Sequence, residues 1–314
     1  MEITNVILNG DVIDKLKELE SESIQCVVTS PPYWGLRNYQ VDGQLGLEKT
    51  PEKYVEKMVE VFREVKRVLK DDGTLWLNIG DSYATQSGTQ GGDIKYKGLH
   101  KNMHKATSNK QPKPSDIGLK HKDLVGIPWR VAFALQRDGW YLRQDIIWHK
   151  PNPMPESVKD RCTKAHEYIF LLTKSPNYYY DSDAIKTEYA NGTQSGSQFG
   201  GKKGNSPEGM KTKLQSSPQG FFKMADGVNK RSVWKIPVKP YKESHFAVFP
   251  EKIPELCIMA GSSVGDIVLD PFFGSGTTGY VAQKLNRKWI GIELNKEYIE
   301  IAKARFNQQE LFYQ

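Results

Sequence analysis

The sequence predicts an α/β fold, with a mostly parallel sheet and helices on both of its faces. Short apolar runs typical of buried strands alternate with segments of helical periodicity near both ends of the chain. A glycine-rich turn joins a strand to a helix late in the chain, and only about 35 residues follow it. Because so short a remainder cannot complete a sheet, we expect N-terminal strands to complete it, in a circularly rearranged order.

The N-terminal part supplies the first strands and helices of this fold. We expect helices over residues 51–70 and 124–136, and strands over residues 25–29, 74–79, 141–149 and 166–173. The first helix is predicted from one apolar stripe, made up of Tyr54, Val55, Met58, Phe62, Val65 and Leu69. The turn signal Asp71-Asp72-Gly73 is expected to end that helix.

The last quarter is the most regular part, with a strand over residues 266–270, a glycine-rich turn over 271–279, a helix over 280–285 and a strand over 288–293. In the turn, Gly274, Gly276 and Gly279 match the pattern G-x-G-x-x-G, and Glu293 ends the following strand. This layout suits an adenosine-containing cofactor, because glycines let the backbone approach the ligand and a carboxylate can accept from both ribose hydroxyls. The alternative is a tight turn with a purely structural role.

Composition limits the environment and the partners of the chain. A net charge of +7 and an isoelectric point near 9.0 permit a polyanionic partner. The sequence has neither a run of about 18 apolar residues nor the layout of a signal peptide, so we expect a cytoplasmic protein that does not enter a membrane. Cys26, Cys162 and Cys257 show no metal-ligand or disulfide spacing, which predicts free thiols and no bound metal.

Four segments, in this order, resemble the amino-methylating DNA methyltransferases of the β arrangement, in which the catalytic motif precedes the cofactor loop. Asn9-Gly10-Asp11 resembles their cofactor-adenine motif, and Thr29 to Trp34 (TSPPYW) resembles their catalytic motif. Residues 245–254 resemble the segment that closes over the methionine part of the cofactor, and residues 270–279 resemble the cofactor loop. The resemblance implies a Rossmann-like methyltransferase fold, S-adenosylmethionine as the cofactor and double-stranded DNA as the partner.

The resemblance also implies which residues bind the cofactor. Glu293 falls where the ribose-binding acid of the family is expected. The expected cofactor-binding residues are Asp11, His245, Phe246, Phe249, Pro250, Asp270, Phe272, Gly274, Gly276, Thr277 and Glu293.

The catalytic motif suits methyl transfer to an exocyclic amine. Such an amine is a poor nucleophile because its lone pair is delocalised into the ring, so the enzyme must accept hydrogen bonds from both amine protons. The Ser30 side chain and the Pro31 carbonyl can be these two acceptors. Proline has a fixed φ and no N–H, so Pro31 and Pro32 hold the carbonyl in place, and Tyr33 can stack on the base. The base must leave the duplex to reach this site.

The sequence favours cytosine N4 as the methylated atom. Methylation of the cytosine ring carbon needs a cysteine nucleophile, typically after proline, and none of the three cysteines follows a proline. Ser30 resembles the cytosine-N4 branch of the family, whereas aspartate in that position is usual for adenine-N6 enzymes. Adenine N6 remains the alternative, followed by a non-catalytic DNA-binding relative.

DNA contacts are expected in two places. Trp34 and Arg37 follow the catalytic motif, although a packing tryptophan and a surface arginine are the plain alternatives. Residues 186–235, which include the polar stretch 190–228, occupy the recognition position of the family, and their lysines suit phosphate contacts unless they belong to a solvated insertion. The expected DNA contacts in this segment are Lys202, Lys203, Lys211, Lys213, Lys223, Lys230 and Arg231.

The predicted organisation has three parts. Residues 1–185 form the catalytic half, with a mobile polar loop over residues 84–121. Residues 186–235 form a target-recognition insertion, and residues 236–314 form the cofactor-binding half. The sequence leaves open the recognised DNA word, the choice between monomer and homodimer, and whether a cognate restriction endonuclease is a partner.

Overall fold

The computed structural model describes residues 4–36, 41–84, 112–187, 227–238 and 249–310. In this part of the chain, eight strands form one sheet in the order β1-β8-β7-β2-β3-β5-β4-β6. The strands are β1 (Val6–Asn9), β2 (Ile24–Thr29), β3 (Leu69–Ile79), β4 (Tyr141–His149), β5 (His166–Thr173), β6 (Val233–Lys235), β7 (Ile267–Asp270) and β8 (Lys288–Glu293).

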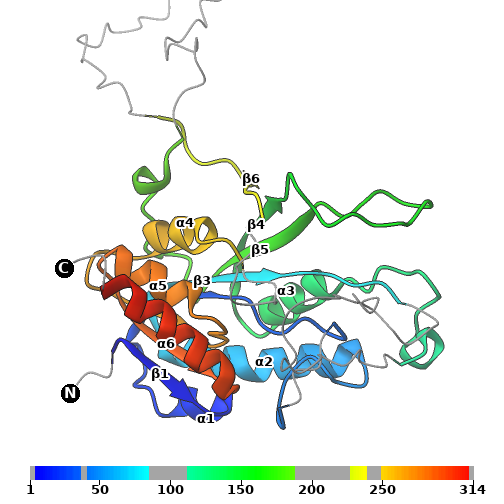
Figure 1. The fold of residues 1–314 in the computed structure, drawn as a ribbon, viewed down its shortest axis with the longest axis horizontal. Coiled ribbons are helices and arrows are strands. Elements are labelled where there is room, and N and C mark those ends of the chain that lie inside the picture. Colours follow the sequence, from blue (N-terminus) through cyan, green and yellow to red (C-terminus); the bar gives the residue numbers. More distant parts are fainter. Residues whose placement is uncertain (1–3, 37–40, 85–111, 188–226, 239–248, 311–314) are drawn as a thin grey trace, which may run out of the picture. The chain divides into compact units, whose positions relative to one another are not determined.

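The sheet joins the two ends of the chain. Strand β7 pairs in parallel with β2 and β8, and β8 pairs in parallel with β1, so the blue N-terminal strand lies beside the orange and red C-terminal elements (Figure 1). This confirms the circularly rearranged order and the mostly parallel α/β fold. Among the described strands, only β5 runs against its neighbours, since it pairs antiparallel with β3 and with β4. The other strands therefore all end at one edge of the sheet, where ligands bind in open α/β sheets.

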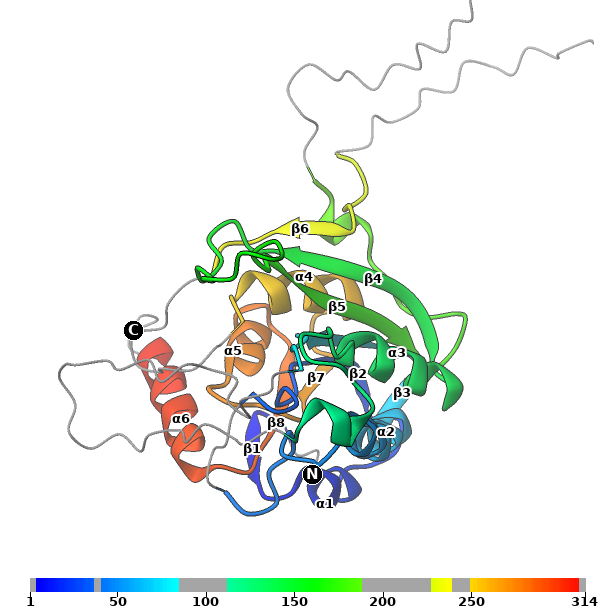
Figure 2. The ribbon, with the colours of Figure 1, turned by 90° about the vertical axis from the view of Figure 1, so that its right-hand side faces the viewer.

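Helices cover both faces of the sheet. Figure 2 shows α1 (Val12–Lys17), α2 (Pro51–Val68) and α3 (Ile127–Arg137) on one side, and α4 (Lys252–Gly261), α5 (Thr277–Lys284) and α6 (Lys296–Glu310) on the other. Helix α2 begins at an N-cap, where the Thr50 hydroxyl accepts a hydrogen bond from the Lys53 N–H at 3.3 Å. Its predicted stripe is buried, with Tyr54, Met58 and Phe62 fully inside the core.

Several element boundaries differ from the prediction; for example, α5 begins at Thr277, before the predicted start at 280. Helix α2 ends at Val68 and β3 begins at Leu69, so Asp71-Asp72-Gly73 lies inside a strand and does not end the helix. Glycine suits this position, because a Cβ on Gly73 would lie 2.7 Å from Leu69 Cδ1 and 3.0 Å from the Gln25 carbonyl oxygen. Helix α3 begins at Ile127, after the predicted start at 124, because Gly126 has a φ of +77° and its N–H donates to Asp81 Oδ1 at 2.9 Å.

The chain divides into two compact units, residues 1–181 with 231–314, and residues 182–230. The second unit is described only at residues 182–187 and 227–230, where Thr187 and Val228 pair their backbones. Its bounds lie near those of the predicted recognition insertion, whose role stays a prediction. Of the predicted loop over residues 84–121, residues 85–111 lie outside the described part, and Pro114–Ile117 forms a 3₁₀ turn. Among the described helices, none combines the length and the hydropathy needed to cross a membrane.

Candidate active site

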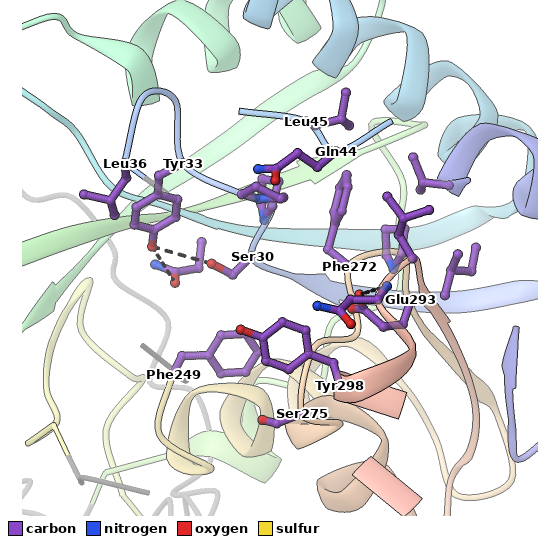
Figure 3. Close-up of a pocket in the computed structure, with 18 of the residues that line it drawn as sticks. Ser30, Tyr33, Leu36, Gln44, Leu45, Phe249, Phe272, Ser275, Glu293 and Tyr298 are labelled. Atoms are coloured by element: carbon purple, nitrogen blue, oxygen red, sulfur yellow. Dashed lines mark hydrogen bonds between the residues drawn. The ribbon is translucent and has the colours of Figure 1, made fainter. Parts of the chain in front are cut away.

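A cavity of about 250 Å³ opens in the larger unit, at the edge where the parallel strands end. Figure 3 shows Ser30 and Tyr33 on one side of it and Phe272 and Glu293 on the other, with Phe249 below. Residues far apart in the sequence therefore form one site with two ends. The end at Ser30 is called here the base end, and the end at Glu293 is called the nucleoside end.

The segment Ser30 to Tyr33 leaves β2 and is held on both sides. The Tyr54 hydroxyl, on α2, donates to the Pro32 carbonyl at 2.9 Å. A Cβ on Gly46 would lie 3.1 Å from the Tyr33 carbonyl oxygen, so the returning chain packs closely against the segment. The predicted catalytic residues Ser30, Pro31, Pro32 and Tyr33 all line the cavity. This rigid setting suits acceptors that must be oriented before the reaction.

A polar network lines the base end of the cavity. The Tyr33 hydroxyl donates to Glu167 Oε2 at 2.7 Å, and the Ser30 hydroxyl lies 3.5 Å from the Tyr33 oxygen. Asn78 donates to the same Glu167 oxygen at 3.3 Å, and Lys150 forms an ion pair with the other. Burial raises the pKa of Tyr33 well above its ordinary value, and the negative Glu167 adds to the effect. Tyr33 is therefore a neutral phenol that donates a hydrogen bond.

The nucleoside end contains a carboxylate that fits a ribose. Glu293 Oε2 accepts from the Gly274 N–H, and its Oε1 accepts from the Asn295 N–H, both at 2.7 Å. A carboxylate offers about four acceptor sites, so two remain for a pair of ribose hydroxyls. Burial is the main cause that raises the pKa of Glu293.

The walls around Glu293 suit the rest of a nucleoside. Asp11 caps α1 through Oδ1, which accepts from the Ile13 N–H at 2.9 Å, and Asp11 also lines the cavity. The aromatic residues Phe249 and Phe272 line the same cavity. A diol acceptor, a further carboxylate and aromatic walls together match the adenosine and sulfonium parts of S-adenosylmethionine.

Asp270 does not line the cavity, and its contact with the cofactor stays a prediction. Its carboxylate accepts from the Thr29 hydroxyl at 2.6 Å, the Thr278 hydroxyl at 2.7 Å and the Phe272 N–H at 3.0 Å. Burial raises its pKa from 3.8 to about 6. Because both of its oxygens bind protein donors, Asp270 holds the loop in shape.

The glycines of the loop also serve packing. Gly276 has a φ of +79°, and a Cβ on it would lie 3.0 Å from Ala302 Cβ and 3.2 Å from Phe273 Cε1. A Cβ on Gly279 would lie 2.6 Å from Phe273 Cζ. These glycines let α5 approach Phe273 and α6, and Gly274 and Gly276 are not among the lining residues. The loop contributes Pro271, Phe272 and Ser275 to the cavity.

Three other predicted site residues lie away from the cavity. Trp34 is only 2% exposed and its indole N–H donates to the Glu48 carbonyl at 2.9 Å, so it packs as a core residue, which favours the plain alternative, and its DNA contact stays a prediction. The Thr277 hydroxyl accepts from Arg305 at 2.9 Å, and the Pro250 carbonyl accepts from the Ile253 N–H at 2.9 Å.

The remaining predicted contacts lie largely outside the described residues. This is so for Arg37, His245, Phe246, Lys202, Lys203, Lys211, Lys213 and Lys223. Lys230 and Arg231 are described, and neither lines the cavity. Their proposed roles in binding DNA or cofactor stay predictions.

The sequence prediction missed Asn78, Lys150 and Glu167. Asn78 lies near the end of a predicted strand, Lys150 directly follows another, and Glu167 lies at the start of β5. Because β5 runs antiparallel to β3 and β4, it begins at the edge where those strands end. No cysteine lines the cavity: Cys162 is exposed, whereas Cys26 and Cys257 are buried, and burial raises the pKa of Cys26 to about 12. The described lining of the cavity therefore contains no cysteine thiolate that could act as a nucleophile.

Comparison with known proteins shows which family the chain belongs to. Residues 24–304 match the family model of the N6/N4 methyltransferases, described as DNA methylase. The Type II methyltransferase M.SmaI of Serratia marcescens is 51% identical over 299 residues, which cover 95% of this chain and 89% of the relative.

Solved structures share the fold. The cytosine-N4-specific PvuII DNA methyltransferase has a TM-score of 0.64 at 21% identity, covering 98% of this chain and 87% of its own. A proposed DNA modification methylase of Thermus thermophilus, complexed with S-adenosyl-L-methionine, has a TM-score of 0.58 at 23% identity, covering 96% and 93%.

Proposed function

Because this chain belongs to the N6/N4 DNA methylase family and is an S-adenosylmethionine-dependent DNA methyltransferase, we propose that it methylates the exocyclic N4 of cytosine. The observation that carries the proposal is Ser30, which opens the Ser-Pro-Pro-Tyr segment in the cavity. Serine in this position is typical of the cytosine-N4 branch. A relative that is cytosine-N4-specific shares the fold, and this agrees with the proposal. Adenine N6 is the second candidate, since Ser30 could also accept from the amine of adenine.

The roles of the site residues follow from the geometry. S-adenosylmethionine supplies a methyl group on a sulfonium sulfur, which is already activated for transfer. Ser30 Oγ and the Pro31 carbonyl accept hydrogen bonds from the amine, so that its nitrogen can become pyramidal. Tyr33 stacks on the flipped base, which offsets part of the cost of leaving the duplex. Glu293 binds the ribose hydroxyls, while Asp11, Phe249 and Phe272 border the nucleoside.

Site choice is proposed to lie in residues 186–235, whose lysines would neutralise DNA phosphates. The relative from Serratia marcescens is a Type II methyltransferase, and we infer that this chain likewise protects DNA against a restriction endonuclease of matching specificity. Such protection can be tested by methylating a genomic library and asking which endonucleases no longer cut it.

The central test identifies the product. Plasmid DNA is incubated with the protein and S-adenosylmethionine, digested to nucleosides and analysed by mass spectrometry against N4-methyl-, 5-methyl- and N6-methyl-nucleoside standards. N4-methyldeoxycytidine is expected from the parent, and the Ser30→Ala variant is the matched control. Finding N6-methyldeoxyadenosine alone would replace cytosine with adenine, and cofactor binding without any product would favour a non-catalytic relative.

A further inference from the structure

We propose that Glu167 is a positioning residue for methyl transfer, because it acts through Tyr33 to fix the direction in which the Ser30 hydroxyl donates. The inference rests on the proposed role of Ser30 as an acceptor, and it holds for a cytosine or an adenine target. The three groups form a chain of two hydrogen bonds, from Ser30 to Tyr33 and from Tyr33 to Glu167.

The direction of this chain follows from proton counting. A carboxylate can only accept, and at 2.7 Å Glu167 takes the single Tyr33 proton in preference to the neutral Asn78 Oδ1, which lies 3.3 Å from the Tyr33 oxygen. Tyr33 can then only accept from Ser30, whose proton points toward Tyr33 across 3.5 Å. The lone pairs of Ser30 are thereby left for the amine protons of the base. Without this order, the serine proton could turn toward the amine, and two donors would face each other.

The surroundings of Glu167 keep it in place as an acceptor. Lys150 and Glu167 are only 19% and 15% exposed at their side chains, and they form an ion pair between the residue that follows β4 and strand β5. The Lys150 ammonium also lies 4.3 Å from the centroid of the Trp148 ring. Asn78 donates to Glu167 and to the Tyr168 carbonyl, at 3.3 and 3.1 Å, which fixes the orientation of its amide. Donors therefore approach both oxygens of Glu167.

These neighbours make Glu167→Gln a sharp test. Lysine has only donors, so the glutamine oxygen must take Lys150 and the glutamine nitrogen must face Tyr33. The amide N–H then donates to Tyr33, whose own proton is freed from the carboxylate and can turn to Asn78 Oδ1 at 3.3 Å or to Ser30 at 3.5 Å. Where it turns to Ser30, the serine proton turns toward the amine, so the substitution removes the fixed direction of the chain although the side chain has nearly the same size.

The experiment measures single-turnover methyl transfer in four proteins: the parent, Glu167→Gln, Tyr33→Phe and the double variant. Glu167→Gln is expected to lower the rate by about tenfold or more, the worth of one charge-assisted hydrogen bond. Its KM for S-adenosylmethionine and its affinity for DNA should stay close to those of the parent. In the Tyr33→Phe background the reversed chain cannot form, so adding Glu167→Gln should cause no further loss of rate.

Several results would overturn the inference. They are a parent-like rate in Glu167→Gln, or a double variant whose losses multiply, as two independent sites would give. Glu60→Gln removes a carboxylate from a surface ion pair with Lys57 and is the matched control, with unchanged rate expected. If Glu167→Gln does not fold, Glu167→Asp tests the same point, because a shorter acceptor should retain the direction of the chain and most of the activity. Identification of methyladenine would refute the proposed cytosine target and leave this rate comparison valid.

Discussion

Replacing Asp270 with asparagine should remove a pH-dependent penalty on the stability of the fold. The folded-state pKa of this carboxyl is about 6, against 3.8 for an ordinary aspartate. A raised pKa means that the folded state holds the proton more tightly, so this stabilising contribution is complete below about pH 3.8 and is lost as the pH rises through 6. A difference of about two pKa units corresponds to about 3 kcal/mol. An asparagine side chain does not titrate, so the variant lacks this penalty.

The neighbouring groups can accept an asparagine. Its oxygen can take the Thr29 hydroxyl and the Phe272 N–H, which share Oδ1 of Asp270. Its nitrogen can donate to Thr278, whose hydroxyl lies 3.3 Å from the Val28 carbonyl and can donate there. The substitution therefore leaves no buried polar group unpaired.

Urea denaturation between pH 4 and pH 8 measures this effect. The difference in free energy of unfolding, Asp270→Asn minus parent, should rise by about 2.4 kcal/mol across the series, because about 0.6 of the 3 kcal/mol is already lost at pH 4. Affinity for S-adenosylmethionine should stay close to that of the parent. A difference that is flat with pH would refute the account of Asp270, and a large loss of cofactor affinity would return Asp270 to the cofactor site.

Four other expectations follow from the site. Ser30→Ala should lower single-turnover methyl transfer by about 100-fold, with cofactor affinity nearly intact in calorimetry; a parent-like rate would contradict its role. Glu293→Ala should weaken S-adenosylmethionine binding by about 10- to 100-fold, because two ribose hydrogen bonds are lost, and unchanged calorimetric affinity would remove Glu293 from the site. Gly276→Val should cost about 1–3 kcal/mol of stability, because its branches meet Ala302 and Phe273; a parent-like melting temperature would contradict this. Neutralising Lys202, Lys203 and Lys211 should make the salt dependence of DNA binding shallower, by about 0.9 in log–log slope for each DNA phosphate that no longer pairs with a lysine, whereas identical slopes would indicate a solvated insertion.

The sequence predicted the strands best where apolar residues filled whole segments. The bounds of β4, β5 and β8 agree with the prediction, since each forms a long pairing in the sheet. Strand β6 has only three residues, and its pairing with β4 is a long-range contact that no local period reveals. The sequence predicted no helix at α4. This helix is buried on most sides, so its residues lack the polar face that marks a surface helix.

The candidate site was predicted as segments, and the structure separates the roles inside each segment. Ser30, Tyr33 and Glu293 line the cavity, whereas their neighbours Trp34 and Asp270 are buried among protein partners. The sequence could not separate them, because burial of Trp34 depends on a carbonyl 14 residues away. Glu167 was missed for a related reason: its hydrogen-bond partner Tyr33 is 134 residues away in the chain.

The circular order of the elements gives the two ends of the cavity a direct connection. Thr29, which precedes Ser30, donates to Asp270 at 2.6 Å, and Asp270 in turn accepts from the N–H of Phe272 in the cavity wall. The parallel pairing of β2 with β7 brings these residues together from opposite ends of the chain. In-line transfer requires the amine nitrogen and the methyl group to be held within about half an ångström of the productive geometry. In the proposed mechanism, the Asp270 side chain therefore links the segment that holds the base to the loop that borders the methyl donor, through hydrogen bonds that an asparagine could also make.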